Sequence, residues 1–119
     1  MTKITKTLLS FALILSAPLV FACDYPAPPK SLPDGNTSTK DEMLAGVKFI
    51  AAYQEDMSTY LACIESEEVL AVQALGDDDD AKKQRSLMFG KKYNAAVEEQ
   101  TRTVEKFNAE IRAYKARSN

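Results

Sequence analysis

A regular spacing of apolar residues in the last third of the chain is the feature that most limits its fold. From position 90 to position 114 the residues suited to helix packing recur in steps of three and four, the spacing of one face of a helix packed on another helix. No proline interrupts this pattern. A packed helix is therefore predicted over residues 80–116. Its packing face consists of Gly90, Tyr93, Val97, Gln100, Val104, Phe107, Ile111 and Tyr114.

A second helix is predicted over residues 39–75, which also lack proline. Thr39 followed by Glu42 is the capping-box pattern of a helix start. Gly76 stands where a glycine commonly ends a helix. The apolar residues take the same steps, with Gln54 in one position of the face. That face consists of Met43, Val47, Ile50, Gln54, Met57, Leu61 and Ile64.

The two helical segments carry opposite charge. Residues 41–75 hold one lysine and seven acidic residues, whereas residues 82–119 hold ten basic and four acidic residues. Joined by a turn at 76–80, they are expected to pair as an antiparallel hairpin, although surface ion pairs mainly set orientation. Folding about that turn brings Gln54 near Gln100. A hydrogen bond between them is the predicted register-setting polar pair; two partly exposed amides are the alternative.

The four aspartates Asp77–Asp80 are interpreted as a turn and a negatively charged helix start. The alternative, a calcium loop, lacks the EF-hand spacing. No metal site and no cofactor is predicted.

The first 22 residues have the pattern of a secretory signal peptide. Lys3 and Lys6 precede an uncharged run over residues 8–20, which is shorter than the roughly 20 residues of a membrane-spanning helix. Ala22 is the small residue that signal peptidase accepts, so cleavage is predicted before Cys23. A retained hydrophobic anchor is the alternative. The processed chain is expected to be exported, either periplasmic or secreted.

Cys23 and Cys63 are the only cysteines. In an exported chain such a pair indicates one disulfide. Residues 23–38 contain four prolines and are predicted to form an extended strap, long enough to run back along the first helix to Cys63. A free or metal-binding thiol is the alternative, but two cysteines without any histidine make a poor metal site. Lipidation of Cys23 is a further alternative, which the bulky Phe21 disfavours.

Several large side chains lie beside the two packing faces and need a cover. Phe49, Tyr53 and Tyr60 flank the first face and are the predicted interaction surface. Either the strap or a homodimer forming a four-helix bundle can cover such side chains. Gly90 suggests a close approach of two backbones; a weak point in the helix is the alternative. A basic stripe is expected to pair with the acidic first helix, and a partner surface is the alternative; it consists of Lys82, Lys83, Arg85, Lys91 and Lys92.

The predicted fold class is therefore all-α. A signal peptide (1–22) precedes a Pro-rich extended strap (23–38) and an antiparallel, coiled-coil-like two-helix hairpin (39–119).

Composition disfavours several classes of function. The net charge of −2 becomes −4 without Lys3 and Lys6, unlike the basic domains that bind nucleic acid. The same acidity disfavours binding to anionic lipid, so no membrane contact is expected unless Cys23 is lipidated. There is no histidine, no phosphate-binding glycine pattern and no nucleophile elbow, so no enzyme activity is expected.

The predicted function is a non-catalytic binding or structural role in the cell envelope, with a protein partner whose identity the sequence does not indicate. A lipid-anchored envelope lipoprotein is one alternative. A periplasmic chaperone-like or inhibitor module is another.

Five segments of the chain have a distinctive sequence: residues 23–35 with their Cys and Pro residues, 40–44, Tyr60-Leu61-Ala62-Cys63, 93–97, and Phe107-Asn108. Together they resemble a family of small uncharacterised exported (periplasmic) proteobacterial proteins, over nearly all of the chain after residue 22. The resemblance implies an exported location and this architecture, and it implies no activity and no catalytic residues. It also favours the disulfide over lipidation.

Overall fold

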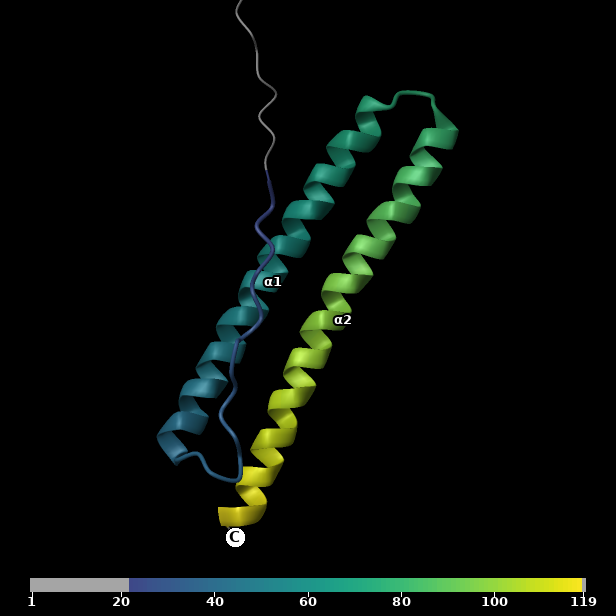
Figure 1. The fold of residues 1–119 in the computed structure, drawn as a ribbon. Helices are drawn as coiled ribbons and strands as arrows, with labels where there is room; N and C mark the ends of the chain where they lie inside the picture. Colours follow the sequence, from purple (N-terminus) through teal and green to yellow (C-terminus); the bar gives the residue numbers. More distant parts are fainter. Residues whose placement is uncertain (1–21, 119) are drawn as a thin grey trace, which may run out of the picture.

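The computed structural model describes residues 22–118. Two long helices, α1 (Lys40–Ala74) and α2 (Asp79–Ser118), lie side by side in opposite directions and are joined by a short turn (Figure 1). The predicted all-α, antiparallel two-helix hairpin is confirmed, and there is no strand within residues 22–118. The predicted signal peptide lies outside the described residues except for Ala22.

The start of α1 has the capping box that the sequence predicts. The Glu42 N–H donates to Thr39 Oγ1 at 3.3 Å, and the Thr39 N–H donates to Glu42 Oε2 at 2.7 Å. The backbone hydrogen bond from Thr39, together with one from its hydroxyl, lowers the pKa of the Glu42 carboxyl. The reciprocal bonds satisfy backbone donors that a helix start otherwise leaves free.

The turn between the helices depends on one glycine and one aspartate. Gly76 has a φ of 57°, in the left-handed region that favours glycine. Asp78 Oδ1 accepts a hydrogen bond of 3.0 Å from the Ala81 N–H, so it caps α2. Asp79 and Asp80 form an acidic first turn, which complements the positive end of the helix dipole. The aspartate run thus acts as a turn and helix start.

Replacing Gly76 with alanine is expected to lower the free energy of unfolding by about 1 kcal/mol, because alanine disfavours positive φ. A Cβ at this position meets nothing within 4 Å, so the cost is conformational. Gly90 is the matched control: it is helical and its Cβ also meets nothing within 4 Å. Gly90→Ala is expected to raise the free energy of unfolding by about 0.5–1 kcal/mol, because alanine favours the helix more than glycine does. Urea unfolding followed by circular dichroism measures the free energy of unfolding of both variants. A change of the same sign in the two variants would contradict the prediction.

The packing face of α1 differs in part from the predicted one. Met43, Ile50, Met57 and Ile64 are buried as expected. The positions between them are wrong by one residue, because the buried residues are one place earlier in the sequence. They are Gly46, Tyr53 and Tyr60, in place of Val47, Gln54 and Leu61, although Leu61 packs partly buried against the core. A face that advances by four and then three residues and a face that advances by three and then four have every seventh residue in common. Periodicity alone therefore did not distinguish the predicted face from the observed one.

The packing face of α2 shows the same ambiguity. Phe107 is buried as predicted, whereas Ala96 and Thr103 are buried next to the predicted Val97 and Val104. The expected backbone approach at Gly90 is wrong, since a Cβ added to this glycine would meet nothing within 4 Å. The remaining predicted residues of the face that pack partly buried against the core are Tyr93, Val104, Ile111 and Tyr114.

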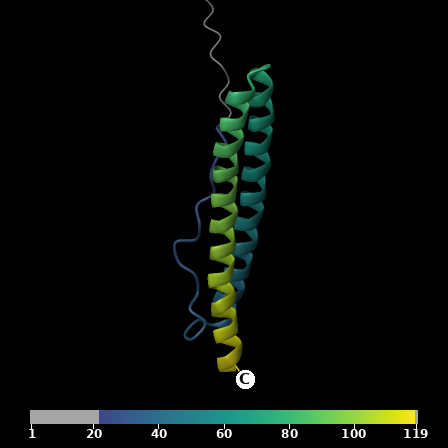
Figure 2. The same cartoon turned by 90° about the vertical axis from the view of Figure 1, so that its right-hand side faces the viewer.

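The buried side chains form two clusters along the hairpin, and the strap (residues 23–38) contributes to both. Cys23 packs against the cluster nearer the turn. Leu32 packs against the cluster nearer the start of α1 and the end of α2. The strap lies on one side of the helix pair (Figure 2). The first cluster consists of Tyr53, Met57, Tyr60, Ile64 and Ala96, and the second of Met43, Ile50 and Phe107.

The end of the hairpin near the turn has a different character. No residue between Ile64 and Ala96 is buried. Four large apolar side chains there are largely exposed, two from each helix: Val69 at 57%, Leu70 at 66%, Leu87 at 62% and Met88 at 73%.

Candidate interaction surface

A disulfide joins the strap to α1. Cys23 and Cys63 are bonded, with Cα atoms 5.8 Å apart and a sequence separation of 40. The predicted pairing is therefore confirmed. Both cysteines are half-buried, and Cys23 packs against the cluster nearer the turn. The bond holds the start of the strap against the middle of α1.

Next to the disulfide, the strap covers a tyrosine of the core. The Tyr25 ring meets the Tyr60 ring edge-on, with centroids 4.9 Å apart and an interplanar angle of 79°, a favoured geometry for aromatic pairs. From α2, Lys92 Nζ lies 5.9 Å from the centroid of Tyr60, within the range of a cation–π contact. Burial raises the pKa of Tyr25, and the neighbouring Tyr53, Glu99 and Tyr60 raise it further.

The other end of the strap is held by α2. The Gly35 N–H donates to Glu110 Oε2 at 2.7 Å, and the Arg117 side chain donates to the carbonyl of Ser38. A Cβ at Gly35 would collide with the backbone carbonyl of Glu110, so only glycine fits there. The sequence reasoning missed this contact, because nothing local to Gly35 indicates a partner 75 residues away.

A second glycine is enclosed by all three segments. Gly46 on α1 faces the Phe107 ring of α2 and Pro33 of the strap, and a Cβ on it would lie 2.7 Å from Phe107 Cζ and 2.9 Å from Pro33 Cγ. Gly46 is three residues after Met43 and four before Ile50, and this helical spacing was the signal in the sequence for its burial.

The predicted interaction surface of Phe49, Tyr53 and Tyr60 is wrong for two of its three residues. Tyr53 is 2% exposed and Tyr60 is 6% exposed, because they face the strap and α2, whereas Phe49 is exposed. The Tyr53 hydroxyl is buried and has no well-formed hydrogen bond within residues 22–118. Burial raises the pKa of Tyr53, the Thr103 hydroxyl lowers it in part, and Glu99 raises it.

The predicted pair of Gln54 and Gln100 is also wrong. Gln54 is exposed and Gln100 is half-buried, and no hydrogen bond joins them among the described residues. The contacts of Gly46 with Phe107 and of Glu68 with Arg85 fix the register of the helices, and this register places Gln100 opposite Tyr53. The alternative of two separate amides therefore holds.

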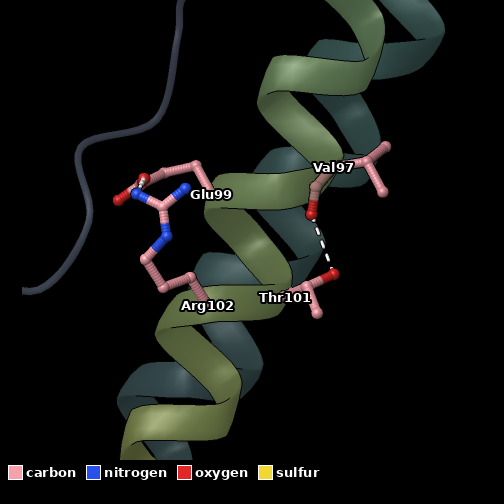
Figure 3. Close-up of polar contacts among 4 residues, drawn as sticks. All are labelled: Val97, Glu99, Thr101 and Arg102. Carbon is pink, nitrogen blue, oxygen red and sulfur yellow. Dashed lines mark hydrogen bonds and ion pairs between the residues drawn. The ribbon is translucent and has the colours of Figure 1, made fainter.

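The charged residues of α2 make few contacts with α1. Within residues 22–118 one ion pair joins the helices, Arg85 Nε to Glu68 Oε2 at 2.9 Å. Arg102 instead pairs with Glu99 of its own helix at 3.3 Å. On the other side of α2, Thr101 Oγ1 donates a hydrogen bond of 2.9 Å to the Val97 carbonyl (Figure 3). The expectation that the whole basic stripe pairs with α1 is thus met at Arg85 alone.

One group of side chains has the spacing of metal ligands. The two sulfur atoms of Cys23 and Cys63 and a carboxylate oxygen of Glu67 lie within 4.8 Å of one another. Metal sites use cysteine as the thiolate, and here both sulfurs are in the disulfide. The oxidised protein therefore offers a single carboxylate at this place.

Within residues 22–118, neither α1 nor α2 has an apolar stretch that is long enough to cross a bilayer. Compared with protein-family models, curated proteins and solved structures, the chain matches none. The fold and the contacts above are therefore the basis for a functional proposal.

Proposed function

We propose that this protein is a small exported helical hairpin that serves as a non-catalytic binding or structural protein of the cell envelope, periplasmic or secreted. The observation that carries the proposal is the disulfide between Cys23 and Cys63. Disulfides persist in oxidising compartments and are rare in the cytosol. The signal-peptide pattern that ends at Ala22 supports the same location.

The arrangement of the three segments supports a binding or structural role. Tyr60 of α1 helps to hold the strap in place through its edge-on contact with Tyr25. The resemblance to small exported proteobacterial proteins supports the location. The strap, α1 and α2 are linked at Cys63, Gly46 and Glu110, so the three segments are held together as one unit.

The lipid-anchored alternative needs the sulfur of Cys23 for a thioether to lipid. That sulfur is bonded to Cys63, and one sulfur atom cannot form both bonds. The disulfide therefore favours the protein without a lipid anchor. A chaperone-like or inhibitor module is a narrower form of the same binding role, which would need a defined client.

The intact mass of the protein recovered from the producing cells tests this proposal. We expect a chain that begins at Cys23 and gains about two hydrogen masses on reduction, because one disulfide takes up two hydrogens. The fraction in which it is found, periplasm or medium, reports its location. A mass increased by acyl chains would replace the proposal with the lipoprotein. An uncleaved, fully reduced chain in the cytosol would overturn both.

A further inference from the structure

The two sulfur atoms of the disulfide have a carboxylate neighbour from α1. Glu67 is four residues after Cys63, so the two side chains lie one turn apart on the same side of the helix. The strap brings Cys23 to the same place. One donor atom from each of these three residues lies within 4.8 Å of the other two. The two cysteines alone made a poor metal site, and the fold adds a third ligand that their positions in the sequence did not reveal.

The carboxylate of Glu67 has no positive charge paired with it. Glu67 is half-buried and forms no ion pair within residues 22–118, whereas its neighbour Glu68 pairs with Arg85 at 2.9 Å. Partial removal of a carboxylate from water without a partner is unfavourable. A cation bound between this carboxylate and the two sulfur atoms would balance its charge.

The sulfur atoms border open space on the surface. Cys23 and Cys63 line a pocket of about 410 Å³, whose lining also includes Asp24 and Asp56. Acidic walls attract cations and raise their local concentration. A small reductant and a metal ion therefore have a route to the two sulfur atoms.

We propose that Cys23, Cys63 and Glu67 form a zinc site that exists only when the disulfide is reduced. A dithiol gives two electrons and two protons to the disulfide and becomes a disulfide itself, which leaves one thiol on each cysteine. Zn²⁺ then binds the two sulfur atoms as thiolates and one carboxylate oxygen, and the two thiol protons are released. Water fills the fourth position of the tetrahedral ion.

The distances and the ligand types suit zinc. Zinc binds thiolate sulfur at about 2.3 Å and carboxylate oxygen at about 2.0–2.2 Å, so tetrahedral ligand atoms lie about 3.6–3.8 Å apart. The three donor atoms are already within 4.8 Å of one another, and the sulfur atoms can separate once their bond is broken. Thiolate ligands select zinc over magnesium and calcium. The metal would then replace the disulfide as the link between the strap and α1.

Zinc titration of the full protein, followed by calorimetry, tests the proposal. A phosphine serves as the reductant in the titration, because a thiol reductant would compete for the metal. We expect one zinc per chain in the reduced protein and none in the oxidised protein. Cobalt(II) is the spectroscopic probe and should show thiolate-to-metal absorption in the reduced protein alone. The variant with Cys23→Ser and Cys63→Ser should bind neither metal at this site.

The contribution of the carboxylate is tested by Glu67→Gln. This change is expected to weaken zinc binding about tenfold or more, since even residues around a metal's direct ligands contribute that much. Glu65→Gln is the matched control, because Glu65 is exposed on the same helix and is outside the group of donor atoms. It should leave the dissociation constant of zinc unchanged.

Urea unfolding reports whether zinc restores the link between strap and helix. The reduced protein should unfold at a higher urea concentration with zinc than with a chelator, because a ligand of the native state stabilises it. The oxidised protein and the double serine variant should keep the same midpoint with zinc and with the chelator.

Each result either supports or overturns the zinc site. One zinc per reduced chain, together with weaker binding by Glu67→Gln, supports it. Absence of zinc binding by the reduced protein overturns it, and so does equal binding by the oxidised protein. Binding that is indifferent to Glu67→Gln overturns the ligand set of three residues. The proposal is independent of the proposed envelope role, whose test is the mass of the recovered chain.

Discussion

Loss of the disulfide is expected to lower the free energy of unfolding by about 4 kcal/mol, the chain-entropy estimate for a closed loop of this length. The loop has a sequence separation of 40 residues. The bond also holds Tyr25 on Tyr60, so its loss should release the start of the strap. A hairpin of two helices has a thin core, and this one cross-link is a large part of what keeps it folded.

The measurement is urea unfolding of the oxidised protein, the reduced protein and the variant with Cys23→Ser and Cys63→Ser. The reduced protein and the variant should unfold at the same, lower urea concentration. Adding reductant to the variant is the control and should change nothing. An unchanged midpoint in the variant would show that the strap does not depend on its covalent link.

Phe107→Ala is expected to lower the free energy of unfolding by about 3–5 kcal/mol, the usual cost of removing a buried phenylalanine. Phe107 is 2% exposed and forms a cluster with Met43 and Ile50, against which Leu32 of the strap packs. The substitution therefore loosens all three segments at once. Thermal and urea unfolding, read from the helical signal, measure the effect.

A second substitution in the same place gives a sharper test. Gly46→Ala in the native protein should cost about 1–3 kcal/mol, because its Cβ would press on the Phe107 ring and on Pro33. In the background of Phe107→Ala the ring is absent, so the added methyl should cost much less. The coupling of the two changes is measured by a double-mutant cycle. Additive effects would contradict the close contact.

The parts of the fold that could be predicted from the sequence are those with a local signal or a single solution. Thr39 and Glu42 stand in the capping-box spacing, and Gly76 follows the last helical residues of α1. Both ends of α1 could therefore be predicted. The disulfide was predictable because Cys23 and Cys63 allow only one pairing within the chain.

The errors have a common physical origin. Both possible packing faces of α1 contain every seventh residue from Met43. Which of them is buried depends on the segments that cover the positions in between, namely the strap and α2. Tyr53 and Tyr60 are buried because the strap and α2 lie over them. The contacts that place the strap, such as that of Gly35 with Glu110, join residues far apart in sequence and leave no local pattern.

The covalent link between strap and α1 also determines how this molecule would carry a pulling force. Tension applied between Cys23 and the carboxyl end of α2 passes directly through the disulfide to Cys63. Residues 24–62 lie inside the closed loop and are shielded from the load. The force falls on the rest of α1, the turn and α2, whose packing would have to peel apart from the turn end or shear along its length. Reduction would bring the shielded residues into the load path and lengthen the molecule's extension under force.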